Sequence, residues 1–225
     1  MQKKNFKNLY LSLVFLLGFI LWTYFLKTTN LAPIGPNGSV VGFSVVNKLF
    51  HNLTGVHMWL YTVTDWLGLV PIGFSCTFAV LGLCQWIRRK NILRVDFSIL
   101  ALGGFYLITF AAYLLFEMYP INYRPVLING YLEASYPSST TLLVMCIMPT
   151  AIMQFNFRMK NKALKTVINS ILAVFSAFMV IGRSLAGVHW LTDIIGSLLF
   201  SVGLTLLYKF VVSLTPKSKK QHPLL

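Results

Sequence analysis

A histidine and an aspartate stand four residues apart near the C-terminal end of the chain, at His189 and Asp193. Two side chains with that spacing share one face of a helix. The carboxylate can then accept the proton of one imidazole nitrogen, which fixes the tautomer and leaves the other nitrogen as a nucleophile. Taken alone, the same spacing fits a hydrogen-bonded structural pair equally well.

Two arginines and a serine accompany this pair. Arg183 lies six residues before His189, and Arg124 directly precedes Pro125. Guanidinium groups can hold a phosphate through paired hydrogen bonds. Ser138 is expected to be the N-cap of a helix, where free backbone N–H groups form an anion site, although a capped helix needs no ligand. Together these residues predict a phosphate pocket with a histidine nucleophile.

The elements that must position these residues are long apolar helices. The chain is 56% hydrophobic and only 11% charged, and its apolar residues form continuous blocks. This composition predicts an all-α bundle embedded in a membrane, since each block can cross a hydrocarbon core of about 30 Å. Six spans are expected, over about 8–26, 67–87, 97–116, 138–157, 166–183 and 189–212.

The first of these blocks also resembles a signal peptide, because the chain begins with a basic segment at residues 1–4. The block is long, contains bulky aromatic residues and lacks a small-residue cleavage site directly after it, so we interpret it as a retained helix. Residues 28–66 are expected to form an outer linker followed by an interfacial helix over 42–66. The whole chain, 1–225, is interpreted as one membrane-embedded domain.

The net charge is +14. A soluble protein with this charge would be a candidate for nucleic-acid binding. Here the basic residues lie between apolar blocks, which instead favours loops that face anionic lipids, and we expect no nucleic-acid partner. Of the 19 Lys and Arg residues, alternating spans place fifteen on one side, and four on the other: Lys27, Lys48, Arg124 and Arg183.

The positive-inside rule makes the basic side cytoplasmic, and an even number of spans puts both termini there. We expect the plasma membrane of a bacterium. The outer side would then collect Arg124 and Arg183 with four other ionisable residues, Glu117, Glu133, His189 and Asp193. Ionisable groups at membrane depth are costly and usually mark function.

These residues resemble the motifs of the PAP2 superfamily of phosphatases: Lys-x6-Arg-Pro, Pro-Ser-Gly-His and Ser-Arg-x5-His-x3-Asp. The chain carries Arg124-Pro125, Pro137-Ser138 and Arg183-x5-His189-x3-Asp193 in the same order. The resemblance covers about residues 110–200. It implies a PAP2-like bundle of six transmembrane helices.

The resemblance also implies a mechanism without metal or cofactor. His189 would attack phosphorus to form a phosphohistidine, and Asp193 would orient it. The phosphoryl oxygens would be held by residues of all three motifs: Arg124, Arg183, Ser138, Ser139 and Thr140.

Four positions depart from the family pattern. Glu117 replaces the lysine of the first motif, and Ser139 replaces the glycine of the second. Thr140 replaces the histidine that protonates the leaving group in the family, and Gly182 replaces the serine of the third motif. Glu117 is a possible substitute acid, or else a solvated charge at a helix end.

The leading interpretation is therefore an outer-leaflet phosphatase acting on a lipid phosphate or diphosphate. Polyprenyl diphosphate, phosphatidic acid and phosphatidylglycerol phosphate share the required head-group chemistry. The alternative is a catalytically decayed PAP2-fold protein that binds lipid phosphates or assists assembly. A transporter is a third class, but the paired broken helices of transporters are missing from the sequence pattern.

Overall fold

The computed structural model describes residues 2–214, with side chains from Phe6 onward. The described chain is helical, with short connections and three isolated β-bridges. Two short 3₁₀ helices, η1 and η2, interrupt the connections at Pro36–Gly38 and Ile92–Arg94. The α-helices are α1 (Gln2–Thr28), α2 (Ser44–Thr54), α3 (Met58–Leu67), α4 (Leu69–Arg89), α5 (Phe97–Met118), α6 (Ser139–Arg158), α7 (Lys162–Leu185) and α8 (Leu191–Ser213).

Six helical segments of the described chain are long and apolar enough to cross a membrane, which confirms the predicted fold class. Five of them match the expected spans to within several residues. The second begins earlier than expected, because α3 continues into α4 at Gly68 and the two together form Met58–Arg89. The segment expected to be one interfacial helix over 42–66 is therefore divided between α2 and the start of this span.

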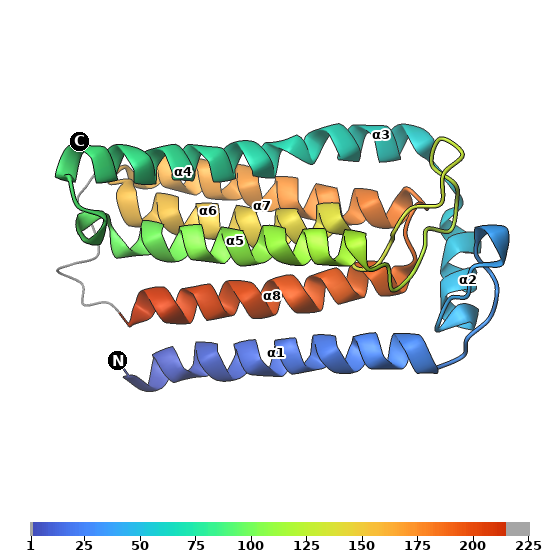
Figure 1. Cartoon of the computed structure of the whole chain (residues 1–225). Coiled ribbons are helices and arrows are strands. Elements are labelled where there is room, and N and C mark those ends of the chain that lie inside the picture. Colours follow the sequence, from blue (N-terminus) through green and yellow to red (C-terminus); the bar gives the residue numbers. More distant parts are fainter. Residues whose placement is uncertain (1, 215–225) are drawn as a thin grey trace.

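The helix α2 lies across one end of the bundle (Figure 1). It buries polar residues, since the Asn47 side chain donates to the Gly42 carbonyl (2.8 Å) and to Thr192 Oγ1 (3.0 Å). Its apolar side chains are exposed, among them Leu49 and Leu53. An exposed apolar face suits a helix that contacts lipid, as expected for the membrane interface.

The long helices lie side by side, and α6 packs against α4, α5, α7 and α8 (Figure 1). Its buried residues form the middle of the largest apolar core. The antiparallel pair α1 and α8 is in close contact, with Ser12 Oγ donating to the Gly203 carbonyl at 2.8 Å. A side chain at Gly203 would collide with Leu16, so glycine permits this close approach.

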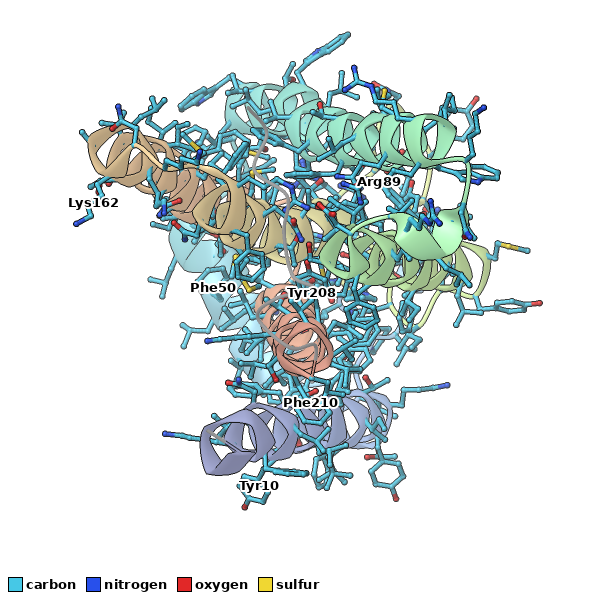
Figure 2. The ribbon with its side chains drawn as sticks, turned by 90° about the vertical axis from the view of Figure 1, so that its left-hand side faces the viewer. Tyr10, Phe50, Arg89, Lys162, Tyr208 and Phe210 are labelled. Carbon is cyan, nitrogen blue, oxygen red and sulfur yellow. The ribbon has the colours of Figure 1, made fainter. Side chains whose placement is uncertain are left out.

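The two ends of the bundle differ in charge. At one end, Asp96 pairs with Arg89 (3.0 Å) and with the buried Arg158 (3.4 Å). Figure 2 views this end directly, with Tyr10 and Lys162 projecting from its periphery. The basic connections α4–α5 and α6–α7 are also here, and the N-terminal end of α1 joins them (Figure 1).

At the opposite end, the α5–α6 connection folds over the bundle beside α2 and α3 (Figure 1). It doubles back on itself through bridges between Tyr123 and Ala134 and between Ile128 and Tyr131. The α7–α8 connection lies at the same end. These two connections bring residues from distant parts of the sequence into one buried polar cluster.

Candidate functional site

His189 lies in the α7–α8 connection, and not on a helix as the sequence pattern predicted. The helix α8 starts at Leu191, after the N-cap residue Trp190. The Asp193 carboxylate accepts the Trp190 backbone N–H at 2.8 Å, which satisfies one of the free donors at the helix start. Both His189 and Asp193 are buried.

The expected direct hydrogen bond between these two residues is missing, because His189 Nδ1 is 3.9 Å from Asp193 Oδ2. The hydroxyl of Ser135 lies between them. Its oxygen is 3.0 Å from His189 Nδ1 and 2.5 Å from Asp193 Oδ2. The other carboxylate oxygen of Asp193 accepts a hydrogen bond from the Asn122 amide at 3.2 Å.

This network assigns the proton positions. Asp193 is surrounded by donors, as an ionised carboxylate requires, so the Ser135 hydroxyl proton points to it. The Ser135 oxygen then accepts the Nδ1–H of His189. On the other side of the ring, Arg183 Nη2 lies 3.3 Å from Nε2, and a guanidinium can only donate. Nε2 therefore carries a lone pair, as a nucleophilic nitrogen must.

The charge state of His189 agrees with this assignment. Burial lowers the pKa of His189 well below 6.5, and the neighbouring Arg124 and Arg183 cations lower it further. Burial and nearby positive charge both disfavour an imidazolium. The ring is therefore neutral near pH 7, and Nε2 holds a lone pair, directed at Arg183, without prior loss of a proton.

Both predicted phosphate-binding arginines are buried at this site. The aromatic ring of Tyr61 on α3 lies under the two guanidinium groups, 5.0 Å from Arg183 Cζ and 5.7 Å from Arg124 Cζ. Arg183 Nη1 also approaches Thr64 Oγ1 at 3.4 Å and Asp65 Oδ1 at 3.6 Å. The start of the second span thus forms one wall of the site.

Several guanidinium donors at this site remain without a hydrogen-bond acceptor among the described residues. They are Nε of Arg183, and Nε and Nη1 of Arg124. The Arg124 Nε lies 3.1 Å from Glu133 Oε2, a charge contact without hydrogen-bond alignment. Buried donors without acceptors are costly, and a phosphoryl group would supply the acceptor oxygens that they lack.

The second-motif residues lie at the start of α6, beside this cluster. Ser138 occupies the N-cap position but makes no side-chain cap, because its hydroxyl donates to Thr141 Oγ1 at 3.1 Å. Its backbone N–H donates to the Asp193 carbonyl at 3.3 Å, which joins α6 to α8. Thr140 is buried and faces Gly68 at the α3–α4 junction.

Glu117, the predicted substitute acid, is not buried with His189. It is exposed at the end of α5, and it borders a small hollow together with Ser135 and Ser139. Glu117 thus shares this hollow with Ser135 but is open to solvent.

The glycine at the serine position of the third motif has a packing role. A Cβ at Gly182 would lie 2.8 Å from Thr64 Cγ2, closer than side chains tolerate. Thr64 is buried, and its hydroxyl donates to the Leu60 carbonyl at 2.8 Å, so it cannot turn away freely. Gly182 therefore permits the contact between α3 and α7 that brings Thr64 to Arg183.

We expect Gly182→Ser to destabilise the folded protein, although serine is the residue that the third motif carries at this position. Overpacking of this kind costs about 1–3 kcal/mol. The melting temperature in detergent should fall, and Gly182→Ser combined with Thr64→Ser should recover most of it, because Thr64→Ser removes Cγ2 and keeps the hydroxyl. Thr64→Ser alone is the matched control. Unchanged melting of the single Gly182→Ser variant would contradict this account.

Sequence reasoning missed the residues that surround the predicted ones: Tyr61, Thr64, Asp65, Asn122 and Ser135. One signal was available, since Asp65 is among only five acidic residues and lies in an apolar stretch. The others are ordinary polar or aromatic residues whose role depends on how the connections fold. Spacing along the chain carries no sign of that role.

Comparison with known proteins adds two findings. The family description "PAP2 superfamily" matches residues 72–216, more than half of the chain. Among solved structures, the chain resembles the crystal structure of the first transmembrane PAP2 type phosphatidylglycerolphosphate phosphatase from Bacillus subtilis. The TM-score is 0.59 at 17% identity, over 92% of this chain and 98% of that one. No curated protein sequence matches the chain.

Proposed function

This chain belongs to the PAP2 superfamily, and from that premise we propose that it hydrolyses a lipid phosphate or diphosphate through a phosphohistidine. One observation carries the proposal. The lone pair of His189 Nε2 faces Arg183 Nη2 at 3.3 Å, while Arg183 and Arg124, which share the Tyr61 ring, keep other buried donors without a hydrogen-bond acceptor among the described residues. A neutral nucleophile next to an unfilled anion site is the arrangement that phosphoryl transfer needs.

The proposed reaction has two steps. In the first, Nε2 attacks phosphorus, the P–N bond forms, and the bond between phosphorus and the leaving oxygen breaks with its electron pair on that oxygen. In the second, a water oxygen attacks phosphorus, the P–N bond breaks, Nε2 recovers its lone pair, and the protons of the water leave with the phosphate product, which exchanges them with solvent. Arg124 and Arg183 stabilise the charge on the phosphoryl oxygens in both steps.

The substrate class follows from the leaving group. Thr140 stands where the family has a histidine acid, and a threonine hydroxyl is too weak an acid to protonate an alkoxide. A diphosphate leaves as a phosphate, which is a much weaker base. We therefore assign a lipid diphosphate, such as a polyprenyl diphosphate, as the preferred substrate over a monoester such as phosphatidic acid.

A second candidate function rests on the positions where the chain differs from the PAP2 motifs. Without the histidine acid, and with Glu117 at the lysine position, the chain could bind a lipid phosphate and not turn it over. Glu133 and Asp65 already lie beside the two arginines, at 3.1 Å and 3.6 Å. Such a protein would bind lipid diphosphate with the same arginines but would release no phosphate.

The test is phosphate release by the purified protein in detergent from a panel of lipid monoesters and diphosphates, with His189→Ala as the comparison. Release that depends on His189 supports the enzyme. Lipid binding that depends on Arg183, without release, supports the second candidate. Release that persists in His189→Ala would reject the proposed mechanism.

We further propose that the site faces outside and that both termini are cytoplasmic. Support comes from the basic connections at the end of the bundle opposite His189, which the positive-inside rule assigns to the cytoplasm. The C-terminal lysines used in the same prediction, Lys217, Lys219 and Lys220, lie outside the described residues.

Engineered cysteines test this orientation. With Cys76, Cys84 and Cys146 replaced, Tyr131→Cys should react with an impermeant thiol reagent in intact cells, and Leu93→Cys should react only after lysis. Both positions are well exposed, at 74% and 84%, so accessibility within the protein does not limit either reaction. Labelling of Leu93→Cys from outside would reverse the proposed orientation.

A further inference from the structure

The hydroxyl of Ser135 is the only described side chain that touches both His189 Nδ1 and the Asp193 carboxylate. We propose that Ser135 is a positioning residue that couples Asp193 to the nucleophile. The inference rests on the proposed function, because it assigns how the same histidine is held. Ser135 lies outside the residues that the sequence pattern identified.

The geometry supports a bridge and not an incidental contact. Direct coupling would need a hydrogen bond from Nδ1 to the carboxylate, but those atoms are 3.9 Å apart. Through Ser135 the two contacts are 3.0 Å and 2.5 Å. Ser135 is itself buried, so water cannot easily replace its hydroxyl.

The surrounding structure holds both ends of this bridge. The Ser135 backbone N–H donates to the Asn122 carbonyl at 2.9 Å, and the Asn122 side chain donates to Asp193 at 3.2 Å. The carboxylate is further fixed by the backbone N–H of Trp190, the residue directly after His189. The connections that carry Ser135 and His189 are therefore tied to the same carboxylate.

The bridge has a chemical role in the proposed reaction. When Nε2 forms its bond to phosphorus, the ring gains positive charge, and Nδ1–H becomes a stronger donor. The Ser135 oxygen accepts that hydrogen bond, and its own proton is held by the negative Asp193. The carboxylate thus stabilises the charged ring across one hydroxyl, without direct contact.

Substitution at Ser135 separates hydrogen bonding from packing. Ser135→Ala removes the hydroxyl, and Ser135→Cys keeps the volume with a weak hydrogen-bonding group. We expect kcat to fall about 10²-fold in both variants, within the range for loss of one oriented hydrogen bond in a catalytic network. KM should change little, because Ser135 contacts Nδ1, whereas Arg183 approaches the ring at Nε2. Ser201→Ala, another buried serine, is the matched control.

A measurement without turnover tests the same inference. Nitrogen-15 NMR of histidine-labelled protein reports the tautomer of His189, identified by the signal lost in His189→Ala. We expect the Nδ1–H tautomer in both proteins, because Arg183 still donates to Nε2, and a changed Nδ1 chemical shift in Ser135→Ala, where the hydrogen bond from Nδ1–H to the hydroxyl is lost. An unchanged His189 signal in Ser135→Ala would overturn the inference.

The outcomes distinguish the two proposals. Wild-type kcat in Ser135→Ala or Ser135→Cys, with His189→Ala inactive, would reject the bridge and leave the phosphohistidine mechanism standing. Full activity in His189→Ala would reject the proposed mechanism itself. If the wild-type protein released no phosphate, the NMR comparison would still decide whether Ser135 fixes the histidine.

Discussion

Replacing His189 by alanine is expected to reduce phosphate release from a lipid diphosphate by at least about 10³-fold, to the background of the assay. In the proposed mechanism His189 supplies the atom that bonds to phosphorus, so its loss removes the nucleophile. Arg183 and Arg124 would remain, so lipid binding should persist while turnover is lost. Phosphate release and lipid binding by the same purified variant measure the two effects separately.

The control for this variant is His57→Ala. His57 is an exposed histidine before α3, and its ring forms a hydrogen bond with the Thr54 carbonyl at 2.9 Å. Its replacement should leave turnover close to the wild-type rate. Acid-labile phosphate bound covalently to the wild-type protein and absent from His189→Ala would identify the attacking residue. Substantial turnover by His189→Ala would show that another group attacks phosphorus.

The overall architecture could be predicted because membrane spans depend on properties that a sequence displays directly. Charge-free apolar runs marked the spans, and the basic clusters marked one set of connections. The start of the second span was missed because Asp65 interrupts the charge-free run there, and because the aromatic residues before it suit an interfacial helix. In the structure its carboxylate is 3.6 Å from Arg183, so a residue distant in sequence compensates its charge.

The site could be predicted only in part, for a related reason. His189, Asp193 and Arg183 were identified from spacing, Arg124 from its place before Pro125 on the outer side, and the structure brings them together. Their relative geometry was not predictable. The spacing of four suggested a shared helix face, but capping of α8 by Asp193 makes the helix begin after His189. Ser135 then fills the gap through folding of the α5–α6 connection, which has no periodic pattern.

The structure also changes the roles expected for two of the predicted residues. Ser138 was expected to cap α6 and offer its hydroxyl to phosphate, yet that hydroxyl and the backbone N–H are both engaged within the protein. Ser138 therefore acts first as a link between α6 and α8. Glu117 is exposed at the end of α5, which favours a solvated charge over a buried acid.

Substrate preference is expected to show a second large effect, after the one predicted for His189→Ala. We expect turnover of a lipid diphosphate to exceed that of a monoester with the same lipid chain by about 10²–10⁴-fold, the usual contribution of a general acid. The departing alkoxide of a monoester needs a proton, and Thr140 cannot supply it. The departing phosphate of a diphosphate needs far less help. Parallel measurements of kcat/KM on the two substrates give the ratio.

Thr140→His tests the cause of that preference. If the missing acid limits monoester turnover, the variant should raise monoester kcat/KM more than diphosphate kcat/KM and so reduce the ratio. Thr140→Asn is the matched control, since it adds a polar group of similar size that cannot act as an acid near neutral pH. Glu117→Gln should leave both rates nearly unchanged if Glu117 is a solvated charge, whereas a selective loss of monoester turnover would make it the substitute acid. Equal wild-type rates on both substrates, unaffected by Thr140→His, would show that protonation of the leaving group does not control substrate choice.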